Sequence, residues 1–332
     1  MAYTVWGAFD QFRKQKVDLD ADEVKKARSS RDYLFEQIKK LADNDAYFPR
    51  LGGSFIPFGS FSRRTKIRPL NDIDMLVLLN GQGTRDEQSR SDPFGSWLKI
   101  TDTNAPLAYF KDEHGYVNST KILNKIRDSL TKVPSYRKAE IHKNLQAVTL
   151  NLVSYPWVFD IVPSVPIADG TRIIHYLVPN GSGDWIRTDP RIDSQNVTKV
   201  NTQHKGEFLP VIRLLKYWNN RTHKPVLKSY HFETLAIKVF SSAAPIQNYQ
   251  QAIKYFFDMC PAYLLSPCLD PKGLGPNLDA NVPYETKQKV AEAMKEAAQF
   301  ASYAIMYEGQ SNPKDAIYWW GRVFGSEFPS YG

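Results

Sequence analysis

The fold is decided by residues 58–77, which read FGSFSRRTKIRPLNDIDMLV. Gly59 and Ser60 form a small-residue turn, where the backbone can come close to a ligand. Asp72 and Asp74 stand two residues apart at the start of an apolar run. Because side chains alternate along a strand, both carboxylates project from the same face. The pattern predicts a central strand, covered on both faces of a sheet, that begins with two acids.

These two carboxylates need a positive partner. On one face of a buried strand they repel each other and lose hydration, which disfavours their charged forms. One explanation is a set of salt bridges to the nearby basic residues Arg63, Arg64, Lys66 and Arg68. The other is a divalent cation, because Mg²⁺ prefers oxygen ligands and keeps substrate phosphates among them. Asp-Ile-Asp taken alone favours the salt bridges.

A third acid changes this balance. Asp160 interrupts the apolar segment 158–162, which is also expected to be a strand. If that strand lies beside the first, Asp160 joins Asp72 and Asp74 around one site. Three carboxylates together with a triphosphate suit two Mg²⁺ ions about 4 Å apart, which activate an attacking hydroxyl and stabilise the leaving pyrophosphate. Phosphoryl transfer needs little beyond this positioning and charge neutralisation.

The composition is that of an ordinary globular protein. The 332 residues carry 43 Lys and Arg against 35 Asp and Glu, a surplus of +8 that suits polyphosphate or nucleic acid without identifying either. Cys260 and Cys268 cannot supply four zinc ligands, so we expect free thiols in a reducing compartment. Residues 1–12 lack a secretion signal, and no apolar run reaches the roughly 18–20 residues of a membrane span. We expect a soluble, cytoplasmic protein without membrane association.

Periodicity predicts a mixed α/β half followed by a helical half. Three- and four-residue spacing of apolar residues indicates helices over 20–41, 121–130, 207–220, 229–242 and 285–307. Strands are expected over 75–79, 147–152 and 157–162. Three polar or Pro- and Gly-rich stretches are expected to be irregular: 81–91, 188–206 and 261–283. We therefore predict a core over residues 1–200, with helix 20–41 bridging both halves, and a helical domain over 201–332.

The order of the motifs resembles a known superfamily. Gly59-Ser60, an eleven-residue spacer, Asp72-Ile73-Asp74 and the later strand acid Asp160 look like the polymerase-β-type nucleotidyltransferases. Further motifs are similar to the CD-NTases, the bacterial enzymes related to cGAS and DncV, which include oligoadenylate-synthase-like members. These are Arg63 with Thr65, Asp160-Ile161-Val162-Pro163, Trp185-x-x-Thr188-x-Pro190, Leu214-Leu215-Lys216-Tyr217-Trp218 and Lys228-Ser229-Tyr230-His231-Phe232-Glu233. The resemblance covers about residues 52–243, with a weaker similarity at Asp270-Pro271 and Asn277-Leu278.

The resemblance implies an α+β fold. A polymerase-β-like nucleotidyltransferase core, a mixed sheet with flanking helices, would be followed by a C-terminal helical bundle, with the active site in the cleft between them. Asp72, Asp74 and Asp160 would be catalytic and would bind two Mg²⁺ ions, for which Mn²⁺ is an alternative. Asp160 would stand nearest the attacking hydroxyl. Gly59 and Ser60 would hold the donor triphosphate.

Three residues of the helical half also receive nucleotide-binding roles from the resemblance. Lys216 would neutralise the triphosphate, Ser229 would contact phosphate, and Tyr230 would stack on the donor base. The residues alone point elsewhere: Lys216 belongs to a polar stripe with Arg213 and Asn220 that is typical of a solvated helix face. Ser229 is a typical N-cap, although a helix N-terminus also binds anions. Tyr230 could equally fill the core.

The leading hypothesis is a magnesium-dependent synthase of cyclic di- or trinucleotide second messengers in bacterial anti-phage signalling. NTPs, ATP among them, would be the substrates, pyrophosphate would be released, and regulatory or effector proteins would be partners. The alternative keeps the chemistry but transfers the nucleotide to an RNA end, a linear oligoadenylate or a small molecule. A third hypothesis is a catalytically silent nucleotide-binding protein. With no zinc-ribbon insertion, nucleic-acid activation is not indicated, and no residue identifies the bases or the linkage.

Overall fold

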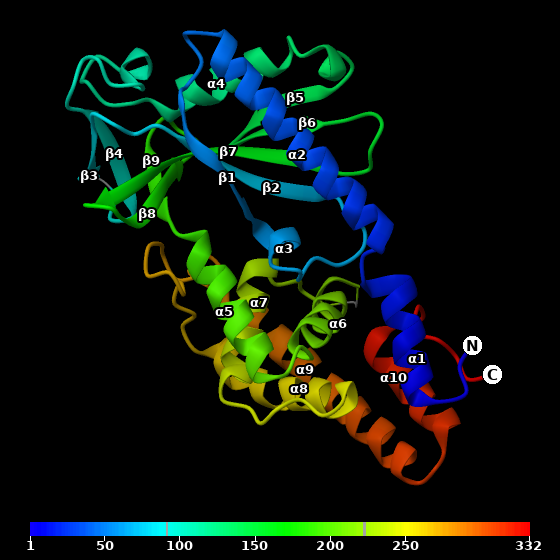
Figure 1. Cartoon of the computed structure of the whole chain (residues 1–332). Coiled ribbons are helices and arrows are strands. Elements are labelled where there is room, and N and C mark those ends of the chain that lie inside the picture. Colours follow the sequence, from blue (N-terminus) through cyan, green and yellow to red (C-terminus); the bar gives the residue numbers. More distant parts are fainter. Residues whose placement is uncertain (91, 222–223) are drawn as a thin grey trace. The chain divides into compact units, whose positions relative to one another are not determined.

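A mixed nine-stranded sheet and a group of packed helices make up the residues that the structure describes, 1–90, 92–221 and 224–332. The structure is a computed structural model and is drawn in Figure 1. Two compact units are present. The sheet unit consists of Ala21–Arg63 and Leu70–Arg191. The helical unit consists of Met1–Asp20, Arg64–Pro69 and Ile192–Gly332, so the chain passes from one unit to the other four times.

The sheet is antiparallel except at its centre. Its strand order is β1-β2-β7-β8-β9-β4-β3, and β6 pairs with both β5 and β7. The strands are β1 (Leu51–Phe58), β2 (Asp72–Leu79), β3 (Thr84–Gln88), β4 (Gly95–Ile100), β5 (Glu140–Asn144), β6 (Ala147–Asn151), β7 (Val158–Asp169), β8 (Arg172–Pro179) and β9 (Trp185–Thr188). Strands β2 and β7 run parallel, side by side.

The central strands follow the apolar pattern of the sequence. In β2 the side chains of Met75 and Leu79 on one face and of Leu76 on the other are almost completely buried, as predicted for a strand covered on both faces. Strand β7 continues past Pro163, where the sequence predicted its end. Its pairing with β6 stops at Ile161 and its pairing with β8 starts beyond Pro163. A proline, which lacks an N–H group, is tolerated where a strand changes partners.

The long helix α2, helix α4 and three short helical segments complete the sheet unit. They are α2 (Ala21–Asn44), α3 (Gly59–Ser62), η2 (Ala108–Phe110), α4 (Ser119–Leu130) and η3 (Pro134–Tyr136). Helix α2 contacts β1 and α4 (Figure 1), and it buries Leu34 and Ile38 as its periodicity predicted. The predicted helix over 121–130 is also confirmed.

The helical unit is built around one apolar cluster. It contains α1 (Val5–Phe12), the π-helical turn η1 (Arg13–Val17), α5 (Pro190–Gln203), α6 (Phe208–Arg221), α7 (Ser229–Ser241), α8 (Tyr249–Leu265), α9 (Tyr284–Gly309) and α10 (Pro313–Phe324). Phe9 of α1 packs edge-on against Trp320 and Phe324 of α10. Within the described residues, no helix is both long and apolar enough to span a membrane.

Three predicted irregular stretches contain regular structure. Residues 84–88 form the edge strand β3, whose polar side chains are partly exposed, and Ser91 lies outside the described residues. Residues 190–203 form α5, which begins with Pro190 at a position that favours proline. Helix α8 continues through Pro261 to Leu265. The predicted division at residue 200 stays a prediction, and the two units group Met1–Asp20 with the C-terminal helices.

Candidate active site

The three predicted acids lie on neighbouring parallel strands of the sheet unit. Asp74 of β2 is the register partner of Asp160 of β7, and Asp72 is paired with Val158. The acids are partly buried, whereas their neighbours Ile73 and Phe159 are completely buried. Since side chains alternate along a strand, the three carboxylates share one face and their apolar neighbours occupy the other.

The carboxylates influence one another electrostatically. Burial raises the pKa of Asp160 above its ordinary value. The hydroxyl of Thr149 donates a hydrogen bond of 2.7 Å to Asp160 Oδ1, which lowers the pKa of Asp160 and partly offsets the effect of burial. The negative charge of Asp72 raises this pKa further. A proton or a cation therefore stabilises this face of the sheet.

The Gly-Ser turn lies directly against one of these acids. Strand β1 ends at Phe58, which is paired with Asp74, and Gly59 begins the short helix α3. Gly59 has a φ angle of +72°, and a Cβ atom placed on it would lie 1.8 Å from Asp74 Oδ2. Any larger residue here would displace the Asp74 carboxylate. The sheet unit thus brings Gly59, Ser60, Asp72, Asp74 and Asp160 together.

The acids fit a divalent cation by their chemistry. Within the described part of the chain, no three His, Cys, Asp or Glu side chains are already arranged as a metal-binding group. However, Asp72, Asp74 and Asp160 offer hard oxygen donors, and the pKa of Asp160 is raised by burial and by Asp72. A divalent cation would offset both the lost hydration and the repulsion between the carboxylates.

Lys216 belongs to the helical unit and is buried. Its side chain is 4% exposed, and its Nζ lies 3.4 Å from Oε2 of Glu233, which is 2% exposed. The hydroxyl of Thr65 donates a 2.7 Å hydrogen bond to the same oxygen. For Lys216 the prediction of a solvated helix face is therefore wrong, since Lys216 on α6 is paired with Glu233 on the neighbouring helix α7, whereas Asn220 is exposed as predicted. Through this hydrogen bond Thr65 braces the loop after the Gly-Ser turn.

Ser229 and Tyr230 begin helix α7. Ser229 is exposed and is the first helical residue, while Lys228 occupies the N-cap position, so the predicted cap was misplaced by one residue. Tyr230 is only partly buried, and its hydroxyl donates to Asp193 Oδ1 over 2.6 Å. Lys272 Nζ lies 4.4 Å from the centre of the Tyr230 ring.

Sequence reasoning missed the polar partners of Tyr230. Lys272 also donates to the Tyr230 hydroxyl and pairs with Asp270 Oδ1 at 2.9 Å. The only signal was a faint similarity around Asp270-Pro271, and Asp193 gave none. Lys216, Ser229 and Tyr230 thus lie on α6 and α7 of the helical unit, whereas the acids belong to the sheet unit.

Known proteins are similar to the whole chain. No protein-family model matches it. A probable cyclic nucleotide synthase of Bacillus cereus strain VD146 is 36% identical over 334 residues, which cover 100% of this chain and 99% of that protein. The cyclic AMP-AMP-AMP synthase of Escherichia coli strain MS 115-1 is 24% identical over 300 residues, 82% of each sequence.

A solved structure shares the fold over nearly the full length. CdnC of E. coli MS115-1 with ATP matches with a TM-score of 0.71 and 18% sequence identity, covering 97% of this chain and 98% of that one. The same protein in a complex with HORMA-deltaN matches with a TM-score of 0.70.

Proposed function

Because the chain belongs to the CD-NTase family of nucleotidyltransferases, we propose that it joins NTPs into a cyclic di- or trinucleotide and releases pyrophosphate. The observation that carries this proposal is the parallel pairing of β2 and β7, which sets Asp74 level with Asp160. The Gly-Ser turn next to Asp74 supports it further, because a triphosphate held there would lie beside the acids.

In the proposed mechanism, Asp72, Asp74 and Asp160 would hold two Mg²⁺ ions. When bound, these would supply a lowered pKa of the attacking hydroxyl and charge stabilisation of the leaving pyrophosphate. Asp160, whose pKa burial raises, would stand nearest the attacking hydroxyl, and its carboxylate form would be favoured with a cation beside it. The amide groups at Gly59 and Ser60, together with the Ser60 hydroxyl, orient the triphosphate.

The proposal also assigns nucleotide contacts to three residues of the helical unit. The ammonium group of Lys216 offsets negative charge of the triphosphate, and Glu233 holds this ammonium group in position. The exposed Ser229, at the start of the thirteen-residue helix α7, contacts phosphate. The donor base stacks on Tyr230, on the ring face opposite Lys272.

Two further parts of the proposal rest on the relatives. The synthase that is 24% identical is named for a product made of three AMP units, which supports ATP as a substrate here. The CdnC complex with HORMA-deltaN supports a regulatory protein partner for this chain. Both are consistent with second-messenger signalling against phage.

The test is incubation of the purified protein with Mg²⁺ and four NTPs, each labelled in turn, followed by phosphatase and mass spectrometry. A phosphatase-resistant cyclic product formed without RNA is the expected result. Label that appears only on added RNA would instead support transfer to an RNA end. Binding of NTP without release of pyrophosphate would indicate a silent protein. An Asp72→Ala, Asp74→Ala double variant is the control and should release no pyrophosphate.

A further inference from the structure

One short segment connects the Gly-Ser turn to the first two acids but belongs to the helical unit. It is Arg64–Pro69. Thr65 is completely buried and Ile67 is 7% exposed within the helical core cluster. Because this segment is the covalent link between Ser60 and Asp72, its position limits where the turn and the strand can lie.

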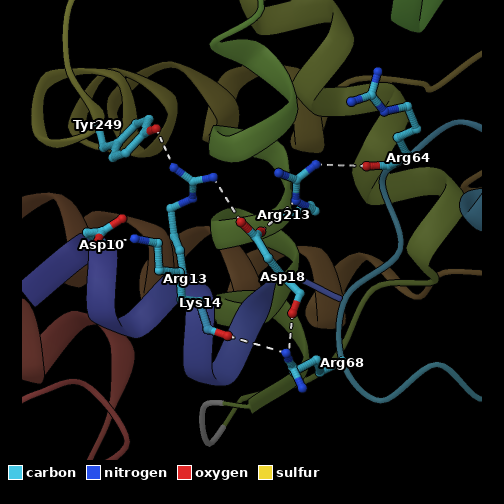
Figure 2. A network of polar contacts seen from close by, with 8 residues as sticks. All are labelled: Asp10, Arg13, Lys14, Asp18, Arg64, Arg68, Arg213 and Tyr249. Carbon is cyan, nitrogen blue, oxygen red and sulfur yellow. Dashed lines mark hydrogen bonds and ion pairs between the residues drawn. The ribbon is translucent and has the colours of Figure 1, made fainter. Parts of the chain in front are cut away.

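The carboxylate of Asp18 is the centre of a polar network around this segment (Figure 2). Arg213 Nε donates to Asp18 Oδ1 over 2.7 Å, and Arg13 Nη2 donates to Oδ2 over 2.8 Å. The Arg68 side chain donates to the Asp18 carbonyl oxygen, and the Arg68 amide donates to the carbonyl of Val17. The side chains of Asp18 and Arg213 are only 21% and 15% exposed, so water screens their ion pair weakly.

Arg213 connects this centre to the start of the segment. Its Nη1 donates a 3.0 Å hydrogen bond to the carbonyl oxygen of Arg64 while its Nε binds Asp18. Arg64 has a φ angle of +63°, and this backbone conformation is energetically unfavourable for any residue that carries a side chain. Such a conformation persists only where its surroundings enforce it. The guanidinium of Arg213, oriented by Asp18, supplies that constraint.

Three of the four passages between the units are attached to this network. The chain leaves the helical unit after Asp20, returns at Arg64 and leaves again after Pro69. Asp18 stands two residues before the first passage, Arg64 lies at the second, and Arg68 stands one residue before the third. The network therefore holds the chain of the helical unit close in sequence to the Gly-Ser turn on one side and to the β2 acids on the other.

We propose that Asp18 and Arg213 are positioning residues for the nucleotidyl transfer, acting through the carbonyl of Arg64 on the Gly-Ser turn. Neither residue needs to touch the nucleotide. This inference rests on the proposed function of the turn and the acids. Arg213 must be an arginine, because the ammonium of a lysine cannot make the same two divergent hydrogen bonds at once.

The experiment compares the full-length wild-type protein with Asp18→Asn, Arg213→Lys and the double variant. Asp10→Asn is the matched control, since Asp10 pairs only with Lys14 among the contacts of Figure 2. Pyrophosphate release is measured with Mg²⁺ and varied ATP at fixed GTP, CTP and UTP, and rates are normalised to the folded fraction. Hydrogen exchange of a peptide covering residues 61–70 is followed by mass spectrometry without nucleotide.

The two single variants are expected to lose about 10- to 100-fold in kcat/KM, the size of effect that a misplaced substrate produces. The double variant should be no worse than the more impaired single variant, because both act through one contact. Residues 61–70 should exchange at least about threefold faster in each, as expected for a segment that opens locally more often. Asp10→Asn should match the wild type in both measurements.

Wild-type kinetics and wild-type exchange in Arg213→Lys would overturn the inference. So would unchanged exchange of residues 61–70 in Asp18→Asn. An inactive wild-type protein would instead count against the proposed function, and the exchange measurement would still decide whether Asp18 and Arg213 hold the segment. If Asp18→Asn and Arg213→Lys lose thermal stability to the same extent but keep the wild-type kcat/KM, the two residues have a merely structural role and the proposal is contradicted.

Discussion

Replacing Gly59 with alanine should disable the site with little damage to the fold. The added Cβ would lie 1.8 Å from Asp74 Oδ2, whereas such contacts essentially never fall below 3.0 Å. The carboxylate must therefore move by about 1 Å or more, a displacement that can cost about 100-fold in rate at a reacting centre. Alanine at the positive φ angle adds strain of about 1–2 kcal/mol.

Gly115→Ala separates the two effects. Gly115 has a φ angle of +82° and no atom within 4 Å of an added Cβ, so alanine there brings the backbone strain without the collision. Each substitution should lower the Tm by a few degrees, at about 2–4 °C per kcal/mol for a unit of this size. Only Gly59→Ala should lower the rate of pyrophosphate release, by about 100-fold. Rates for the two variants within threefold of each other would refute the reasoning.

Two further predictions concern the charges of the site. Burial and the charge of Asp72 raise the pKa of Asp160, so ionised Asp160 destabilises the folded protein. This loss of stability is present above the raised pKa. It disappears below about pH 4, where the carboxyl is protonated in both the folded and the unfolded protein. Asp160→Asn should therefore raise the Tm at pH 7 in EDTA but not at pH 3.5, and an equal gain at both values would contradict the assignment. Lys216→Met should lower the free energy of unfolding by about 3–5 kcal/mol, because it removes the positive charge that the buried carboxylate of Glu233 faces and leaves it the Thr65 hydroxyl as a donor. Adding Glu233→Gln should restore most of that stability in urea unfolding but not the binding of a fluorescent ATP analogue; restored binding would show that Lys216 has no role toward the nucleotide.

The geometry of the acids could be predicted because it depends on local periodicity. Two-residue spacing is enough to place Asp72 and Asp74 on one face of a strand. That the strand with Asp160 lies beside the strand with Asp72 and Asp74 was inferred from the order of the motifs. Residue spacing could not predict it, because strands far apart in sequence carry no local pattern that identifies their pairing partner. The structure supplied that pairing directly, as the register of Asp74 with Asp160.

The partners of the basic residues could not be predicted. Arg213 and Lys216 look like a solvated helix face until Asp18 and Glu233, contributed by other elements, are placed beside them. Burial of a charge depends on such a partner, and the partner of Arg213 is 195 residues away in sequence.

Two elements lacked a sequence signal for a similar reason. Helix α5 buries little beyond Val197 and Val200, so its apolar stripe was too narrow to detect. Strand β3 is an edge strand whose charged residues are held by backbone pairing with β4. In both, hydrogen bonds and tertiary packing outweigh the polar composition that predicted a loop.

The central claim is that Asp72, Asp74 and Asp160 hold metal ions together, and Mn²⁺ titration followed by electron paramagnetic resonance tests it most directly. With a non-hydrolysable ATP analogue present, the wild-type protein should bind two Mn²⁺ ions, and changing any one of the three acids to asparagine should abolish or strongly weaken binding of at least one. Wild-type stoichiometry and affinity in Asp160→Asn would contradict the claim, because the third carboxylate would then have no part in the site.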